Sequence, residues 1–264
     1  MAVNLTDYAR ADPAGVRADA TLVAEVIGGK TIYTTLRSAP PLTLRATPEG
    51  VYIVGTLAGP LGGDELTLNV TAAPEAFLEI RSSAASVVLP GPGGSPSSTS
   101  FAFDVGAGAT LDWQPEPLVL ARASNHRGRT LISASEGAAV IWRDEVVLGR
   151  HGEESGSLLQ RLRVEVDARP VLCTEVGLGP LWAGWDGPCG VGPARCVGSL
   201  LVLGRDSSRL RSVVGAIGSQ TDLRAAVFDL DGGGVLVSVL SENPRAARSF
   251  LDDLATGLRT PPRA

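Results

Sequence analysis

The sequence is poor in the residues that disulfide-rich proteins and many hydrolases depend on. Its 264 residues include three cysteines and two histidines, and aromatic residues make up 5%. A small and odd number of cysteines argues against a disulfide framework, so we expect reduced thiols. Only His126 and His151 could serve as imidazole bases, and no G-x-S-x-G segment occurs. A hydrolase is therefore the least favoured class.

Lysine and long apolar runs are also scarce. Lys30 is the single lysine among 23 basic residues, and the net charge is −5. No basic patch interleaved with aromatic residues stands out, so nucleic acid is not an expected partner. No run of about 18 apolar residues occurs, as a membrane helix would need. Residues 1–20 have no apolar core of the kind a signal peptide carries, and we expect a cytoplasmic protein.

What the sequence does contain is a series of strand patterns. Leu66, Leu68 and Val70 alternate with polar residues, which is the period of a half-buried strand. Similar segments are separated by turn residues every eight to twelve positions, for example at Gly28-Gly29 and around Pro74. These features predict an antiparallel-rich, mainly β protein. No period of 20 to 50 residues indicates a regular solenoid.

The C-terminal part has helical spacing instead. Residues 205–218 begin with capping residues, and Asn243 followed by Pro244 is typical of a helix start. In the second segment apolar residues fall on one face, which we expect to be core: Phe250, Leu251, Leu254 and Leu258. We predict a flexible extension over residues 1–20 and a single domain over residues 21–264.

Two glycine-rich segments need separate interpretation. Gly62-Gly63 precede Asp64, but the strand pattern that follows and the absence of a Lys-Ser/Thr pair exclude a phosphate-binding loop. Asp64 could then be a metal ligand or a turn residue. Residues 91–100, rich in Gly, Pro and Ser, predict a flexible loop.

Metal-ligand spacing is weak. Cys189 and Cys196 are too far apart for a C-x-x-C knuckle and Cys173 stands alone, so small buried residues or loop thiols are favoured. His126 is flanked by turn-forming residues, which favours a solvated loop histidine.

The acidic segment 142–156 is less ordinary. Asp144 and Glu145 are expected to open a strand and to point to opposite faces of it. A buried unpaired carboxylate is costly, so an inward one needs an arginine, a metal ion or water. A surface strand with a charged rim is the simpler reading.

Three stretches in order carry a resemblance to a known family: residues 58–88 with "GPLGGDELTLNV", residues 106–124 with "LDWQPEP", and residues 142–156 with "LGRHGEESG". With the tail at 235–262, they resemble the urease accessory protein family called UreD or UreH. The resemblance implies stacked mixed and antiparallel sheets in a β-helix-like arrangement, with about two helices near the C-terminus.

The resemblance also implies a function. Members of the family act as scaffolds and metallochaperones, not enzymes, and bind apo-urease with UreF and the GTPase UreG. They hold no tight cofactor, help to pass nickel through a wet internal passage, and can form a homodimer within the accessory complex. A β-rich binding or structural module without a metal role is the alternative.

Residues can be assigned by motif position. The expected transient nickel contacts are Asp64 first, then Asp144 or Glu145, and then Glu175. The expected structural positions are Gly59, Gly62, Gly63, Trp113, Gly149 and Arg150.

Overall fold

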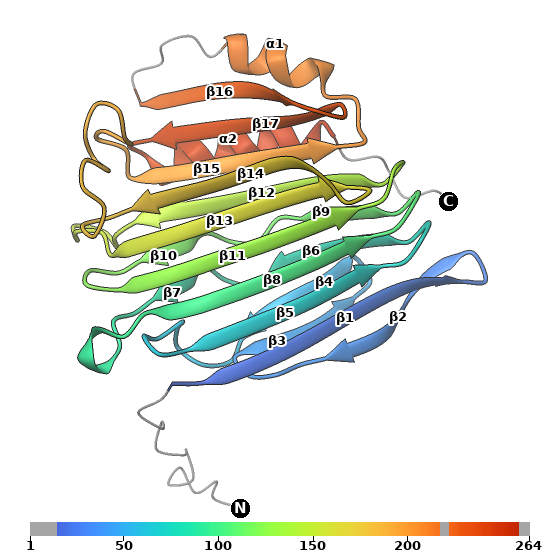
Figure 1. Ribbon diagram of the computed structural model, residues 1–264, viewed down its shortest axis with the longest axis horizontal. Helices are drawn as coiled ribbons and strands as arrows, with labels where there is room; N and C mark the ends of the chain where they lie inside the picture. Colours follow the sequence, from blue (N-terminus) through green and yellow to red (C-terminus); the bar gives the residue numbers. More distant parts are fainter. Residues whose placement is uncertain (1–14, 217–221, 259–264) are drawn as a thin grey trace, which may run out of the picture.

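The computed structural model describes residues 15–216 and 222–258. Figure 1 shows strands running side by side in two stacked layers, with two helices near the C-terminal end. Residues 1–14 of the predicted N-terminal extension lie outside the described residues, and the first strand begins at Arg17. The mainly β fold with two C-terminal helices is confirmed.

The front sheet contains seven strands among the described residues. They lie in the order β14 (Arg169–Leu178), β13 (Ser157–Val166), β11 (Asn125–Ala134), β8 (Ser97–Val105), β5 (Glu65–Ala72), β1 (Arg17–Ile27) and β2 (Lys30–Arg37). The inner pairs, from β1 to β13, are all parallel. Only the edge strands β2 and β14 join by antiparallel pairing.

The back sheet is larger and less regular. Its main path is β16 (Leu223–Leu230), β17 (Gly234–Ser241), β15 (Cys196–Leu203), β12 (Ala139–Leu148), β9 (Thr110–Trp113), β6 (Phe77–Ser82), β4 (Gly50–Gly55) and β3 (Leu42–Thr47). The short strands β7 (Ser86–Val88) and β10 (Leu118–Leu120) pair beside β12. A 3-10 turn, η2, spans Pro92–Gly94.

The prediction of an antiparallel-rich protein was wrong for the centre of the molecule. The turn at Ala73-Pro74-Glu75 does not make a hairpin but carries the chain from β5 in one sheet to β6 in the other. The next such turn stacks on it, because Glu75 N–H donates to the carbonyl of Ala107 at 3.0 Å. Successive strands therefore enter alternate sheets and pair in parallel with the previous coil. Period-two alternation is the same for both arrangements, so it could not distinguish them.

The predicted loop over residues 91–100 was also partly wrong. Residues 92–94 form η2, but β8 already begins at Ser97, whose side chain is fully buried. The Ser97 hydroxyl can be buried there because it is hydrogen-bonded to His126 Nδ1 at 2.8 Å.

The space between the sheets holds most of the apolar core. The larger cluster includes an aromatic group in which Trp113 and Trp142 stack at 4.9 Å and Phe103 meets both edge-on. A smaller cluster at the other end of the sheets includes Leu148 and Leu158. Trp113, predicted as a structural residue, is therefore a core residue.

The helices lie near the C-terminal strands. α1 spans Ser208–Ala216 and contacts β16, and α2 spans Pro244–Thr256 and packs on β15, β17 and β12 (Figure 1). The side chain of Asn243 caps α2 by accepting from Arg245 N–H, as predicted. Leu251, Leu254 and Leu258 are buried in a third cluster that joins α2 to the back sheet, with Phe250 packed beside it.

Candidate functional site

Strand β12 presents two neighbouring carboxylates to different environments. Both lie in the middle of the strand, not at its start as predicted. The expected opposite orientation is confirmed, since Asp144 is bonded to β13 of the front sheet while Glu145 is bonded to α2 on the other side.

Asp144 points into the space between the sheets. Gln160 Nε2 on β13 donates to Asp144 Oδ2 at 2.8 Å, so one hydrogen bond bridges the two sheets. Burial raises the pKa of Asp144 to about 6, against the hydrogen bonds from the Glu145 backbone and from Gln160 that favour the charged form. The carboxylate is thus mostly ionised at neutral pH in a poorly solvated place.

His126 belongs to the same region, and the prediction of a solvated loop histidine was wrong. It lies in β11 and is 1% exposed, with Nδ1 2.8 Å from Ser97 Oγ and Nε2 3.1 Å from Thr99 Oγ1. Burial lowers the pKa of His126 to about 4, so the ring is neutral at physiological pH. Both ring nitrogens are engaged by hydroxyl groups of the neighbouring strand.

These residues form a polar belt, which we define as Ser97, Thr99, His126, Asp144 and Gln160. The belt lies between the two apolar clusters of the inter-sheet space. On β12, Asp144 is flanked by Trp142 of the larger cluster and Val146 of the smaller one. On β13, Gln160 lies between Leu158 of the smaller cluster and Leu162, which packs against the larger.

The neighbouring strand makes room for the belt. Gly128 on β11 is in register with Gln160, and a Cβ atom there would lie 2.2 Å from Gln160 Oε1. The missing side chain therefore allows Gln160 to turn inward toward Asp144. Sequence reasoning missed Ser97, Thr99, His126 and Gln160. The available signal was the period of two along β11, because His126 falls at the same alternate positions as the buried residues further along the strand.

Glu145 lies on the opposite face of β12, beneath α2. It is 3% exposed, and its Oε1 atom lies 3.2 Å from Arg143 Nε and 2.8 Å from Arg248 Nη1. Burial raises the pKa of Glu145, while Arg248 and Arg143 act to lower it. Arg143 also pairs with Asp252 of α2. The buried Glu145 carboxylate thus has arginine partners, which is one of the three ways of compensating a buried carboxylate that the sequence allowed.

Asp64 is placed by the turn that precedes β5. It is 4% exposed, and its two carboxylate oxygens accept from Val16 N–H and Leu61 N–H, each at 2.8 Å. The side chain therefore ties the start of β1 to the turn. Gly62 allows close approach there, since a Cβ atom on it would lie 2.3 Å from the Ser95 carbonyl oxygen. The flanking Gly59 and Gly63 belong to the same turn, and β5 follows, as predicted.

Glu175 lies elsewhere again. It is exposed on the outer face of β14 and pairs with Arg161 of β13. The four predicted carboxylates are thus distributed over the inter-sheet space, the α2 interface, a turn and the outer surface. Within residues 15–216 and 222–258, no group of three or more His, Cys, Asp or Glu side chains could hold a metal ion together.

The remaining motif residues hold the loop after β12. Gly149 has a positive φ of 82°, and a Cβ atom there would lie 2.4 Å from the Glu153 carbonyl oxygen. Arg150 is exposed and binds Glu153 through two 2.7 Å contacts, and this hydrogen bonding lowers the pKa of Glu153 to about 2. These residues stabilise the loop and contact no belt residue.

The cysteines are not brought together. Cys173 and Cys189 are exposed and Cys196 is buried beneath α2. Burial raises the pKa of Cys196 to about 12, so its thiol stays protonated, a form that ligates metals poorly.

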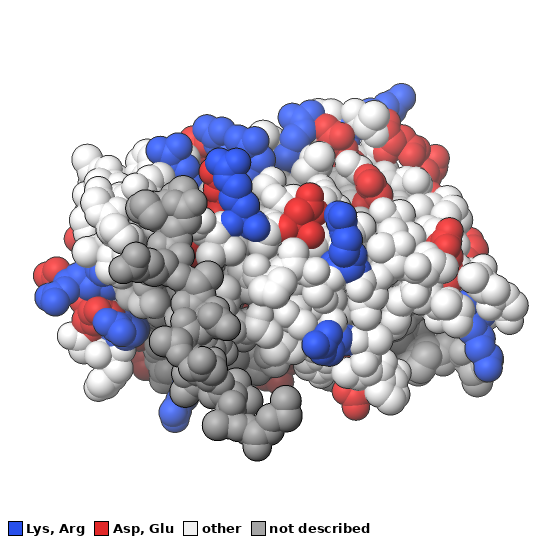
Figure 2. Space-filling model, turned by 90° about the horizontal axis from the view of Figure 1, so that it is seen from below, with Lys and Arg blue, Asp and Glu red and all other residues white. Residues whose placement is uncertain are grey.

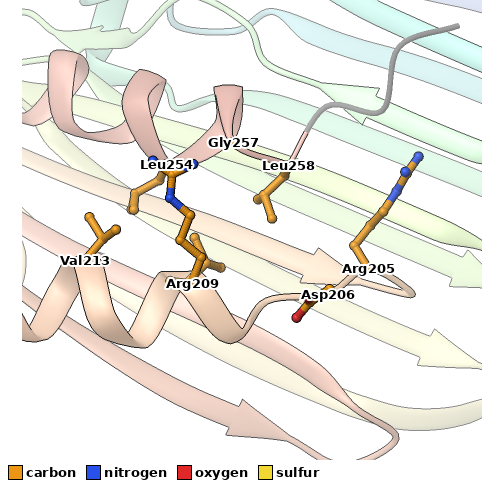
Figure 3. Close-up of a pocket in the computed structure, with 8 residues that line it drawn as sticks. Arg205, Asp206, Arg209, Val213, Leu254, Gly257 and Leu258 are labelled. Carbon is orange, nitrogen blue, oxygen red and sulfur yellow. The ribbon is translucent and has the colours of Figure 1, made fainter.

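One pocket opens between the two helices. It has a volume of about 390 Å³, and Figure 3 shows side chains of both helices around it, with Leu254 and Leu258 opposite Val213 and Arg209. It lies apart from the polar belt, so the belt and the pocket are separate features.

Charge on the outer surface is mixed. Figure 2 shows acidic and basic side chains among broad uncharged areas on the face seen from below. No helix among the described residues is long and apolar enough to cross a membrane.

Together these features define a mainly β protein of two stacked sheets whose interior is divided by a polar belt. The chain belongs to the UreD urease accessory protein family, whose model matches residues 16–263. Curated relatives called urease accessory protein UreD agree. One from a Parafrankia species is 39% identical and covers 91% of this chain and 88% of its own length. Another, from Streptomyces avermitilis, is 37% identical, with 93% and 98% covered.

Proposed function

We propose that this chain is a maturation scaffold for urease, through which nickel passes to the apo-enzyme. Membership of the UreD family carries the general role, because relatives across nearly the whole chain bear the name urease accessory protein. The polar belt supports the finer part of the proposal. His126, which is buried, and Asp144, which is half-buried, place two titratable side chains in the inter-sheet space, and such groups cluster at functional sites.

The chemistry of the belt suits a cation in transit. A partly desolvated carboxylate, an amide and hydroxyl groups offer oxygen ligands. The neutral imidazole would add a nitrogen ligand, which nickel favours, on exchanging one of its hydroxyl hydrogen bonds for the ion. The belt supplies a single carboxylate, so binding would be weak and reversible. Transfer requires that property, since a cargo ion must leave as well as enter.

Of the four predicted carboxylates, we propose Asp144 for this route. Asp64 has both oxygens bonded by backbone N–H groups, Glu145 is bonded by two arginines, and Glu175 pairs with Arg161 on the surface. A role for these three in nickel transfer stays a prediction. Their present contacts support structural roles.

We further propose that the chain acts without catalysis, in the cytoplasm, in a complex with UreF, UreG and apo-urease. A homodimer within that complex stays a prediction, as does the lack of nucleic-acid binding. The competing proposal is a β-rich binding module with no part in metal transfer.

Co-purification from cells that express the complete urease system tests the role. We expect this chain to be recovered with urease and its accessory proteins, and urease from a deletion strain to lack nickel. Full nickel loading of urease in the deletion strain, with no association, would refute the proposal. Association with normal nickel loading would support the binding module instead.

A further inference from the structure

The outer face of the front sheet carries four exposed arginines on two adjacent strands. Side chains of Arg127 and Arg129 project from β11, and those of Arg161 and Arg163 from β13. The two strands are parallel, with Arg129 in register with Arg161. We call these four residues the arginine array. The strands that carry it run side by side through the middle of Figure 1.

The arginines of the two strands differ in their ion pairing. Arg161 pairs with Glu175, and Arg163 pairs with Glu165. Among the described residues, no ion pair or side-chain hydrogen bond engages Arg127 or Arg129. Within residues 15–216 and 222–258, the array therefore has two exposed positive charges without an ion-pair partner, in a chain whose net charge is −5.

The arrangement does not help the sheet to fold. Like charges directly opposite one another on neighbouring strands are destabilising, and Arg129 is in register with Arg161, whose charge is offset only in part by its exposed pair with Glu175. An exposed strand could carry Thr or Gln at these positions without that repulsion. A negatively charged group bound beside Arg127 and Arg129 would reduce the remaining repulsion, because these two arginines have no ion-pair partner among the described residues.

The spacing suits carboxylates on a protein segment. Arg127 and Arg129 are two residues apart on one strand, so their Cα atoms are about 6.6 Å apart, which is the two-residue repeat of an extended chain. Beside them on β8, Ser98 and Ser100 occupy the register partners and supply hydroxyl groups. Each guanidinium can bind a carboxylate through two parallel hydrogen bonds.

We propose that the arginine array docks an acidic segment of a partner protein, with carboxylates at alternate positions along β11. Nucleic acid fits less well. Glu165, Glu175 and Asp104 lie around the array on the same face and would repel a longer polyanion. The array itself offers no aromatic side chain for base stacking. This proposal rests on the surface alone and stands whether or not the belt carries nickel.

A peptide of alternating Glu and Ser residues, fluorescently labelled, is a suitable probe with the full chain. We expect saturable binding that weakens as salt is raised, and about tenfold or greater loss of affinity in the Arg127→Glu, Arg129→Glu double variant. The Arg127→Ala, Arg129→Ala double variant should lose less affinity for the peptide than the double glutamate variant does. Arg169→Glu, an equal charge change per site at the exposed start of β14, should bind as the wild type does.

Three results would overturn the proposal: no binding by the wild type, equal binding by the double variant with unchanged circular dichroism, or tighter binding of a single-stranded oligonucleotide of equal charge. The last result would assign the array to nucleic acid.

Discussion

Gln160 on the front sheet donates a 2.8 Å hydrogen bond to Asp144 on the back sheet. This contact crosses the inter-sheet space at the place where the apolar core divides in two. The pKa of Asp144 in the folded protein, and the pH dependence of stability that follows from it, therefore depend on the environment inside the polar belt.

Replacing Asp144 by Asn should stabilise the protein at neutral pH. Because the pKa is raised from 3.8 to about 6, the folded protein binds this proton more tightly than the unfolded chain. The wild type thus gains stability as pH falls from about 6 toward 4, and Asn lacks this dependence. We expect Asp144→Asn to raise the free energy of unfolding by up to about 3 kcal/mol at pH 7. The difference should shrink below pH 5.

Urea unfolding at several pH values measures this effect. Asp104→Asn, which changes an exposed carboxylate on the outer face of β8, is the matched control and should shift stability little. If Asp144→Asn were less stable than the wild type at pH 7, the carboxylate would have a stabilising partner that this account lacks.

His126 should make the protein less stable in acid, which is the opposite of the effect expected from Asp144. Its pKa is lowered from 6.5 to about 4, so the stability that it contributes is complete above pH 6.5 and is lost as pH falls toward 4. In the Asp144→Asn background, we expect about 2 kcal/mol to be lost between pH 7 and pH 5. A further His126→Gln change should abolish most of that loss. An unchanged pH profile would mean that the ring is not the buried neutral group described here.

Asp64→Ala should destabilise the turn before β5. The change leaves Val16 N–H and Leu61 N–H without their acceptor, which we expect to cost about 3 kcal/mol. Glu65→Ala is the adjacent control, and it should cost less than about 1 kcal/mol because its ion pair with Arg17 is exposed. Thermal unfolding compares the two. A variant that folds normally and binds its partners but activates urease poorly would instead assign Asp64 to the nickel route.

Arg248→Ala should loosen α2 from the back sheet. Arg248 reaches both Glu145 and Glu116, and removing it leaves a buried carboxylate with Arg143 as its remaining partner. We expect a loss of about 3 kcal/mol in the free energy of unfolding. Arg245→Ala, on the exposed side of the same helix, should be nearly neutral. Equal effects of the two changes would contradict a structural role for the buried ion pairs.

Local features were predictable from the sequence where local physics decides them. The Gly28-Gly29 hairpin, the Asn243 cap and the apolar face with Leu251 and Leu254 follow from turn geometry, capping and helical period, and all three are present. The opposite orientation of Asp144 and Glu145 follows in the same way from strand geometry.

Features that depend on pairing between distant strands were not predictable. Whether the turn at Pro74 joins neighbours in one sheet or passes between sheets depends on contacts with residues about thirty positions away, such as Ala107. The burial of His126 depends on hydroxyl groups of β8, and the inward turn of Gln160 depends on the missing side chain at Gly128. The belt therefore became visible only in three dimensions.

The nickel content of urease matured with Asp144→Asn tests the central claim most directly. The variant should fold with at least wild-type stability and should still co-purify with urease and its accessory proteins. If the belt carries nickel, the urease recovered should hold much less of the metal than urease matured with the wild type or with Asp104→Asn. Full nickel loading by the stable, partner-bound variant would contradict the account.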